Sequence, residues 1–315
     1  MTEPTIDPAP IGPATAAAGA ALRAAAERET LGIVGAPFAL AARLVEEAGF
    51  DAVYLSGAAF SAGTLGVPDI GLFTRDQLVE QTRILARAVT IPVVVDADTG
   101  FGGPRDVEET VRLLEAAGAA AIQFEDQPGD VAGGKRCGHL GGKQVIETAA
   151  MADRIAAACA GRRDPATVII GRSDARGVNG FDDLLGRLEA YAAAGADWLF
   201  PEALASRDEF GRVGRDFGVG PLLLANMTEF GRSPLVSIPD LAELGFGAVL
   251  YPVTLLRLAM KAMEAGLAVL ADEGTQESLL DLMQSREELY EMLGYDPANP
   301  GRHRAGPAAA RQETP

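Results

Sequence analysis

The stretch IPVVVDADTGFG (residues 91–102) joins a run of β-branched apolar residues directly to two aspartates and a glycine-rich turn. A short apolar run of this kind, bounded by turn residues, is typical of a buried β-strand. Seven similar runs lie along the chain, and together the eight are GIVGA (32–36), AVYLSG (52–57), IPVVVDAD (91–98), AAIQFED (120–126), TVIIGRSD (167–174), DWLFPE (197–202), PLLLANMTE (221–229) and GAVLYP (247–252). The spacing predicts eight parallel strands.

Amphipathic helical patterns separate these runs. The segment RDVEETVRLLEAAG (105–118) places Val107, Val111 and Leu114 on one stripe and its charges opposite. Glycines such as those at 49, 118 and 195 are suited to end such helices. Eight β/α units predict an α/β protein with a (β/α)8 TIM-type barrel. The alternative is a doubly wound open sheet, but no glycine-rich dinucleotide fingerprint follows the first strand.

The predicted barrel accounts for a single domain over residues 21–296. The flanking segments 1–20 and 297–315 are rich in Ala, Pro and polar residues, and they are predicted to be disordered tails. Two further helical runs, residues 254–271 and 276–293, follow the eighth strand and exceed what a minimal barrel needs.

The composition limits the possible partners. With 44 acidic residues against 27 Lys and Arg, the formal charge of −17 argues against nucleic acid and anionic membrane surfaces. The first residues lack a basic segment followed by an apolar run, so we expect a cytoplasmic protein. Two cysteines in 315 residues form no disulfide framework, and each thiol needs its own explanation.

Polar residues follow nearly every apolar run. In a parallel barrel the carboxyl ends of the strands form the mouth where active sites lie, so these residues are predicted to converge. They are Tyr54, Ser56, Gly57, Asp96, Asp98, Glu125, Asp126, Arg172, Asp174, Glu202, Asn226, Thr228, Glu229 and Arg257.

Asp96 and Asp98 are two residues apart, so in an extended strand they would point to the same side and could share a divalent cation. Oxygen ligands alone favour magnesium. The alternative to a metal site is that one carboxylate caps the next helix and the other is solvated. Glu125, which follows on the neighbouring strand, favours the metal site. Zinc is less favoured because Cys137 and His139 have no second pair at ligand spacing, and His139 stays a minor ligand candidate.

The stretch GGKRCGHLGGK (133–143) places Cys137 among positive charges in a glycine-bounded loop. Neighbouring cations favour a reactive thiolate, whereas Cys159 in a helical pattern is predicted to be a small core residue. GHLGGKQ (138–144) fails as a phosphate loop because its spacing is short and Gln replaces Ser or Thr.

Arg172, at a strand end, is predicted to clamp a carboxylate with its bidentate edge. Arg286 lies in a helical run, where a surface salt bridge is the simpler account.

Seven ordered motifs give the chain a recognisable resemblance. They are VDADTGFG (95–102), EDQ (125–127), KRCGH (135–139), FPEA (200–203), LANMTEFGRSPL (224–235), LYPVTLLR (250–257) and MQSREELYEMLGY (283–295). Over about residues 20–297 the chain resembles the isocitrate lyase and phosphoenolpyruvate mutase superfamily, and in particular its members that cleave 2-methylisocitrate. The resemblance implies a magnesium-dependent retro-aldol cleavage of 2-methylisocitrate to pyruvate and succinate, in propionate catabolism. It also implies a homotetramer in which the last helix is exchanged with a neighbouring subunit.

The resemblance also implies roles for individual residues. Asp96 and Asp98 match the metal pair, with Asp69 and Glu125 in a second shell around it. Cys137 matches the catalytic acid, Tyr54 stands near the reacting hydroxyl as the base, and Arg172 contacts the substrate in the catalytic group. The other substrate-binding positions are Ser56, Gly57, Ala58, Lys135, Gly138, His139, Glu202, Asn226, Met227, Thr228, Arg257 and Arg286. Phe200 and Leu250 match an apolar pocket for the extra methyl group.

Several positions depart from the family pattern. Ala58 and Ala59 replace glycines, Gln123 stands where His is frequent, Ser173 replaces Thr, and the segment before KRCGH is longer. The alternatives within the superfamily are 2,3-dimethylmalate lyase, isocitrate lyase and carboxyphosphonoenolpyruvate mutase. A non-catalytic ligand sensor on a barrel is a distant alternative, and the presence of Cys137 and the aspartate pair argues against it.

Overall fold

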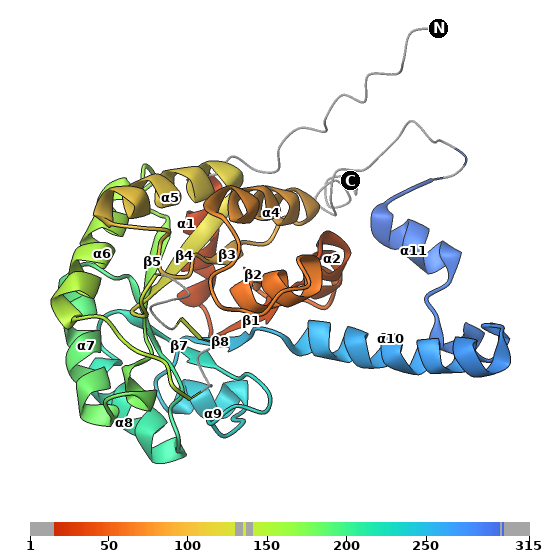
Figure 1. Cartoon of the computed structure of the whole chain (residues 1–315). Coiled ribbons are helices and arrows are strands. Elements are labelled where there is room, and N and C mark those ends of the chain that lie inside the picture. Colours follow the sequence, from red (N-terminus) through yellow and green to blue (C-terminus); the bar gives the residue numbers. More distant parts are fainter. Residues whose placement is uncertain (1–15, 130–134, 137–140, 297, 299–315) are drawn as a thin grey trace, which may run out of the picture.

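The computed structural model describes residues 16–129, 135–136, 141–296 and 298 (Figure 1). Each strand pairs in parallel with the next, and the last pairs with the first, so the sheet closes into a barrel. The strands are β1 (Leu31–Gly35), β2 (Ala52–Leu55), β3 (Val93–Asp96), β4 (Ala119–Glu125), β5 (Val168–Ser173), β6 (Trp198–Pro201), β7 (Leu222–Asn226) and β8 (Ala248–Tyr251). The predicted (β/α)8 barrel is confirmed.

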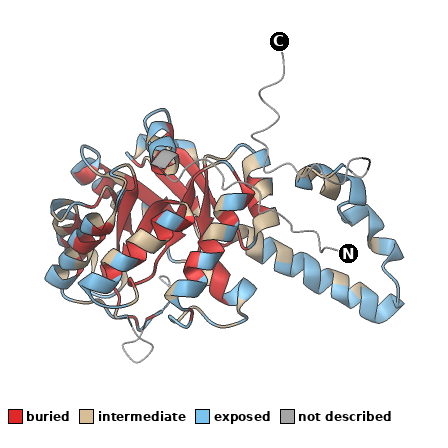
Figure 2. Cartoon of the chain, turned by 90° about the horizontal axis from the view of Figure 1, so that it is seen from above, coloured by how far each residue is buried: buried red, intermediate tan, exposed pale blue. Residues whose placement is uncertain are grey.

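The strands are buried on both faces, as their nearly continuous apolar runs predict (Figure 2). Successive side chains alternate between two cores. Val53 and Val95 pack outward with helix residues such as Leu78, whereas Tyr54 and Val94 belong to the core inside the barrel. This period of two leaves the inward-facing side chain at each strand end pointing into the barrel mouth.

Helices cover the outside of the barrel (Figure 1). They are α2 (Ala39–Glu47), α4 (Arg75–Ala88), α5 (Pro104–Ala117), α6 (Thr148–Gly161), α7 (Phe181–Ala193), α8 (Arg207–Phe217) and α9 (Ile238–Glu243), with short elements α3 (Gly57–Ala59), η1 (Phe60–Thr64) and η2 (Ala175–Gly177) at the mouth side. Thr74 and Gln77 form a capping box that begins α4. Gly118 ends α5 at φ 108, in the left-handed region that glycine tolerates, as predicted.

Helix α1 (Ala16–Ala26) covers the amino ends of the strands. Its Leu22 is fully buried in the inner core, and Arg23 donates to the Ala166 carbonyl at 2.8 Å and to Asp197 at 2.8 Å. The predicted boundary between tail and barrel at residue 20 therefore falls inside a helix. Alanine-rich sequence favours helix, and packing against the barrel provides the burial that composition alone does not indicate. The remainder of both predicted tails, apart from residue 298, lies outside the described residues.

The chain leaves the barrel after β8 as an arm, which we define as residues 254–296. Its helix α10 (Thr254–Glu273) has no buried residue and extends away from the barrel (Figures 1 and 2). The second run, predicted as one helix, is instead a 3-10 segment, η3 (Glu277–Leu282), followed by α11 (Arg286–Leu293). The break occurs because Ser285 forms a capping box with Glu288 and so starts a new helix. No helix in the described part of the chain is long and apolar enough to cross a membrane.

Candidate active site

A pocket opens at the carboxyl ends of the strands and collects most of the predicted residues. It is lined by side chains from seven of the strands and from the segments that follow them: Tyr54, Ser56, Ala58, Asp69, Asp96, Asp98, Glu125, Lys135, Arg136, Arg172, Phe200, Glu202, Asn226, Thr228, Leu250, Pro252, Val253 and Arg257. The convergence expected from the strand ends is therefore present, since parallel strands deliver their last side chains to one face.

Three carboxylates form the floor of the pocket. Asp96, Asp98 and Glu125 each offer one oxygen, these oxygens lie within 4.8 Å of one another, and all three residues are buried. The prediction that Asp98 is extended is wrong: its backbone is left-handed, with φ 52. Its backbone N–H donates to Asp96 Oδ1 at 3.2 Å. The two carboxylates therefore meet through this turn and not through the alternation of an extended strand. Glu125, predicted to lie in a second shell, is close enough to be a direct ligand.

Burial leaves these acids short of compensating charge. It raises the pKa of Asp98 to about 7, although Lys135 opposes the shift, and it raises the pKa of Glu125 well above its usual range against the pull of Arg172. A divalent cation held by oxygen ligands would satisfy this donor set, so the residues fit the expected metal.

An ammonium group stands beside the acidic floor. Lys135 Nζ lies 2.6 Å from Asp98 Oδ1 and 2.8 Å from Asp69 Oδ1. Burial would lower the pKa of Lys135, but the surrounding carboxylates, Asp98 first, raise it above its ordinary value. The group is therefore charged and partly neutralises the cluster. Asp69 thus approaches the cluster through Lys135.

The turn after β2 needs a small residue where it meets the aspartates. Gly57 N–H donates to Asp96 Oδ2 at 3.2 Å, and a Cβ at this position would lie 3.2 Å from that oxygen and 3.4 Å from Asp98 Oδ1. The Ser56 side chain caps the turn by accepting from the Ala59 N–H at 3.3 Å. Ser56 and Ala58 line the pocket, and Gly57 contributes its backbone.

Tyr54 belongs to a hydrogen-bonded chain inside the barrel. Its hydroxyl donates to Gln123 Oε1 at 2.7 Å, and Gln123 Nε2 donates to Asp96 Oδ1 at 3.1 Å. Burial first, and the charge of Asp96 second, raise the pKa of Tyr54 well above 10. The phenol is therefore a proton donor here. Gln123, noted in the sequence only as a departure, is the link between Tyr54 and a candidate metal ligand.

Arg172 crosses the pocket wall with its guanidinium held on several sides. Its Nε and Nη2 donate to the two carboxylate oxygens of Asp174 at 3.1 and 3.2 Å, and its charge lies 3.6 Å from Glu125. The guanidinium also stacks over the Phe200 ring at 5.1 Å. The predicted bidentate clamp exists, but its partner in this structure is Asp174 of the protein itself.

The opposite wall and the rim carry the other predicted contacts. Asn226 Nδ2 donates to both oxygens of Glu202, at 3.1 and 3.3 Å. Arg257, at the start of the arm, has a side chain that is 47% exposed, an ion pair with Glu229 at 3.5 Å and the Phe230 ring 5.2 Å away. Its exposure leaves the guanidinium at the rim of the pocket, where it can meet an anion.

Two predicted site residues lie elsewhere. Met227 is buried in the outer core, where its sulfur accepts from the Val236 N–H at 3.2 Å, because it alternates with the inward-facing Asn226. Arg286 is the first residue of α11 on the arm and does not line the pocket of its own chain. Cys137, Gly138 and His139 lie outside the described residues.

Some residues around the site were missed by the sequence reasoning. Asp126 and Asp174 were noted only as polar strand ends, and Lys143 only as part of the glycine-bounded stretch. Lys143 Nζ lies 2.6 Å from Asp174 Oδ1, with both side chains buried. A lysine that ends a glycine-rich loop is usually solvated, so no local signal distinguished it.

This geometry matches a class of protein: a (β/α)8 barrel enzyme whose mouth is built to bind a metal ion and an anionic ligand. The sequence profile of the phosphoenolpyruvate phosphomutase family matches residues 22–271. The chain is 50% identical over 265 residues to the probable 2-methylisocitrate lyase 1 of Corynebacterium glutamicum, covering 84% of this chain and 85% of that protein. It is 48% identical to the 2-methylisocitrate lyase of Aeropyrum pernix, covering 81% and 80%.

Solved structures of proteins from the same superfamily have a similar fold. The crystal structure of 2,3-dimethylmalate lyase, a member of the PEP mutase/isocitrate lyase superfamily, superposes with a TM-score of 0.81 at 34% identity, covering 88% of this chain and 91% of that one. The structure of phosphonopyruvate hydrolase in complex with oxalate and Mg++ superposes with a TM-score of 0.77 at 29% identity, covering 88% and 94%. The chain belongs to the phosphoenolpyruvate phosphomutase family.

Proposed function

We propose that the protein is a carbon–carbon lyase that uses magnesium to cleave 2-methylisocitrate to pyruvate and succinate, a reaction of propionate catabolism in the cytoplasm. The observation that carries this proposal is the buried triad of Asp96, Asp98 and Glu125 facing Arg172 across one pocket. The curated relatives named 2-methylisocitrate lyase, at 50% and 48% identity, support the choice of substrate.

Asp96, Asp98 and Glu125 would hold the magnesium ion. When bound, the ion would supply Lewis-acid stabilisation of charge that develops on the substrate hydroxyl as the carbonyl forms. The donor set consists of hard carboxylate oxygens, which suits Mg²⁺ better than softer metals. The Mg++ in the related phosphonopyruvate hydrolase complex is consistent with this assignment.

An anionic substrate needs positively charged groups to bind it, and the carboxylates of the floor do not provide them. Arg172 and Arg257 both line the pocket. Arg257 can bind a carboxylate with two N–H groups, and Arg172, whose Nε and Nη2 donate to Asp174, presents Nη1. Lys135 adds a third cation above the acids. These groups would orient the substrate so that the bond to be broken lies over the floor, and the apolar side chains of Phe200 and Leu250 would receive the methyl group.

Two side chains are assigned proton transfers in this proposal. Cys137 would protonate the carbanion left on the succinate half, as its match to the family's cysteine implies. Tyr54 would remove the hydroxyl proton only if positive charge near its oxygen outweighs the burial and the Asp96 charge that now raise its pKa. A cation bound at Asp96 would supply such charge.

The test is a substrate comparison. Purified protein with magnesium is incubated separately with 2-methylisocitrate, isocitrate and 2,3-dimethylmalate, and keto-acid release is followed. We expect 2-methylisocitrate to have the highest kcat/KM, exceeding isocitrate by tens-fold to a few hundred-fold, because one buried methyl group contributes only ~1–3 kcal/mol of discrimination. Equal efficiency toward 2-methylisocitrate and isocitrate would refute the substrate assignment, and a preference for 2,3-dimethylmalate would move the enzyme to that branch of the superfamily.

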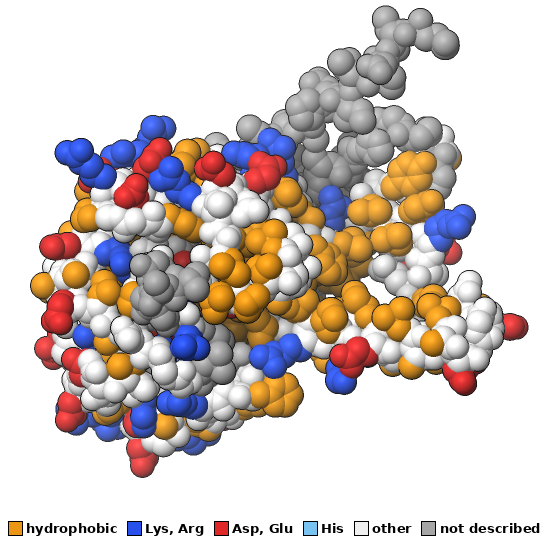
Figure 3. Space-filling model, viewed as in Figure 1, with side chains coloured by type: hydrophobic (Ala, Val, Ile, Leu, Met, Phe, Trp, Pro, Cys, Tyr) orange, Lys and Arg blue, Asp and Glu red, His pale blue; other side chains and the backbone are white. Residues whose placement is uncertain are grey.

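We also propose a homotetramer in which the arm packs on a neighbouring subunit. The arm exposes large apolar side chains along α10, among them Met260, Met263, Leu267 and Leu270, at spacings of three and four residues (Figure 3). Such a stripe is expected to be covered by another surface. In that assembly Arg286, which is remote from its own pocket, would approach the pocket of a neighbour.

A further inference from the structure

A buried ion pair lies just behind the substrate pocket, outside its lining. Lys143 Nζ and Asp174 Oδ1 are 2.6 Å apart, and their side chains are 1% and 0% exposed. Lys143 ends the glycine-bounded stretch 133–143, whereas Asp174 follows β5. The pair thus ties two segments that are 31 residues apart in the sequence.

Asp174 is the same carboxylate that grips Arg172. Its Oδ2 accepts from Arg172 Nε at 3.1 Å and its Oδ1 from Nη2 at 3.2 Å, so Oδ1 is shared between the guanidinium and Lys143. This arrangement sets the plane of the guanidinium. It leaves Nη1 directed to the Glu125 side of the pocket, where the two charges are 3.6 Å apart.

The backbone that carries Asp174 is itself fixed. Asp126 Oδ1 accepts from the Asp174 N–H at 2.8 Å, and Asp126 Oδ2 accepts from Ser173 Oγ and from the Tyr191 hydroxyl, each at 2.7 Å. Arg187 Nη1 lies 3.3 Å from the same Oδ2. The carboxylate of Asp174 therefore cannot turn away easily, and its charge must be compensated in place.

The carboxylates around Arg172 outnumber its single positive charge, and Lys143 supplies a second one. Arg172 faces Asp174, Glu125 at 3.6 Å and Glu202 at 3.8 Å, so three carboxylates surround one guanidinium. A buried carboxylate without its own partner would reduce the positive field that Arg172 presents to an anionic ligand. Lys143 compensates Asp174 from behind and so leaves the charge of Arg172 available in front.

We propose that Lys143 is a positioning residue for substrate binding: by pairing with Asp174, it holds the Arg172 guanidinium in plane and keeps its charge available to a substrate carboxylate. The proposal rests on the proposed function only in that the ligand is a small polycarboxylate. It assigns Lys143 no contact with the reacting atoms.

The experiment compares Lys143→Met, Asp174→Asn and the double variant with the parent, on whichever of the three substrates the parent cleaves. Lys143→Met should raise KM at least tenfold and change kcat less, because a ligand carboxylate loses attraction in the ground state and the transition state alike. The double variant should have a lower KM than Lys143→Met alone, because Asp174→Asn removes the charge that Lys143 compensated. Such non-additivity is the signature of a direct pair.

Arg23→Met is the matched control, because it breaks a partly buried ion pair with Asp197, 2.8 Å long, at the opposite end of the barrel. It should lower the melting temperature and leave KM unchanged. Lys143→Arg, which restores the charge, keeps the test available if the methionine variant fails to fold, and its KM should lie nearer the parent's than that of Lys143→Gln.

Three results would overturn the proposal. They are an unchanged KM in folded Lys143→Met, additive effects in the double variant, or equal KM values for the arginine and glutamine variants. Absence of turnover in the parent on all three substrates would instead count against the proposed function. In that case succinate binding in the presence of magnesium, measured by calorimetry, gives the same comparison, with Lys143→Met expected to weaken it at least tenfold.

Discussion

Asp98 combines a ligand role with an unusual backbone. Its φ of 52 lies in the left-handed region, which Asn and Asp tolerate better than alanine does. Both its charge and its conformation contribute to the geometry of the acidic floor, and substitutions can separate the two.

We expect Asp98→Asn to lose magnesium binding and to reduce kcat/KM by more than ~10²-fold, since even changes to groups behind metal ligands cost 10–100-fold. Its melting temperature should stay near that of the parent, because asparagine keeps the left-handed turn. Asp98→Ala should lose activity equally and also melt earlier through backbone strain. Calorimetric titration with Mg²⁺ and thermal melts measure both effects; magnesium binding at parental affinity in Asp98→Asn would contradict the metal assignment.

The ammonium group of Lys135 would compete with a metal ion for the same carboxylates. Its ammonium is 2.6 Å from Asp98, one of the candidate ligands. We expect Lys135→Met to bind Mg²⁺ more tightly than the parent at pH 8 in the absence of substrate, because a competing positive charge is removed. Turnover should nevertheless fall, since the same group faces the anionic substrate. Calorimetry without substrate decides the point, and weaker magnesium binding in the variant would show that Lys135 supports the metal site.

The two cysteines should differ in reactivity. Burial raises the pKa of Cys159, and its thiol lies 3.2 Å from the Gly195 carbonyl. Below that raised pKa little thiolate is present, so its alkylation should be slow at pH 7 and accelerate as the pH rises. We expect iodoacetamide to inactivate the enzyme through Cys137, and mass spectrometry of the modified peptides identifies the site. Inactivation that tracks labelling of Cys159 would count against the proposed acid.

Between elements, helix packing depends on glycine at a few places. Gly214 of α8 lies against the end of α9, where a Cβ would come 1.6 Å from the Leu244 carbonyl oxygen. Backbone cannot yield as a flexible side chain would, so the two helices are held at a distance that only glycine permits.

Gly214→Ala should therefore destabilise the protein by about 1–3 kcal/mol or more, the usual cost of overpacking. Gly186 of α7 offers the control, because a Cβ there meets nothing within 4 Å. Gly186→Ala should stabilise the protein by about 0.5–1 kcal/mol, as expected for a helix interior. Chemical denaturation of the two variants should move the midpoint in opposite directions, and a shared direction would refute this account of the α8–α9 contact.

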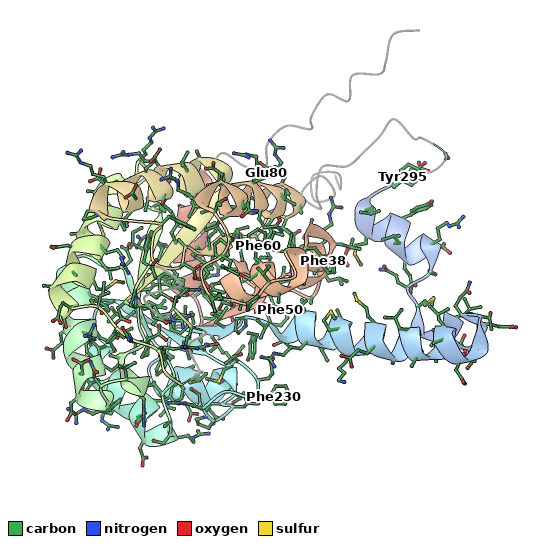
Figure 4. All side chains as sticks on the ribbon, in the orientation of Figure 1. Phe38, Phe50, Phe60, Glu80, Phe230 and Tyr295 are labelled. Atoms are coloured by element: carbon green, nitrogen blue, oxygen red, sulfur yellow. The ribbon has the colours of Figure 1, made fainter. Side chains whose placement is uncertain are left out.

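The arm determines how the whole molecule meets its neighbours. It begins at Thr254, near the exposed ring of Phe230, runs outward along α10 and then turns back through α11 to Tyr295, near its C-terminal end (Figure 4). Phe230 is 92% exposed, which adds an apolar surface at the base of the arm. Arg43 of α2 donates to the Met292 carbonyl at 2.9 Å, so a hydrogen bond joins α11 to the barrel of its own chain.

We expect the parent protein to be a tetramer and Met263→Asp/Leu267→Asp to form smaller species, because two charges would be buried in the predicted contact. Val219→Asp is the matched control: Val219 is fully exposed in the loop before β7, away from the arm. Light scattering coupled to size exclusion gives the masses. A monomeric parent, or a tetramer that survives the double substitution, would refute the proposed exchange of the arm.

Much of this protein is determined locally in its sequence. Short, nearly continuous apolar runs predicted the eight strands and, through them, which residues arrive at the mouth, including Asp96, Glu125 and Arg172. These signals succeed because strand formation and burial depend on neighbouring residues, and because a closed parallel barrel leaves one face for all strand ends. The separate helix α11 was also encoded locally, in its Ser285 and Glu288 capping box, although the prediction missed it.

Only the tertiary structure decided which charges meet. The pairing of Lys143 with Asp174, the approach of Glu125 to Asp96 and the contact of Lys135 with Asp98 join segments separated by tens of residues. Ion pairs and ligand sets depend on distances in space and on desolvation, and neither quantity exists until the barrel closes and buries the groups together.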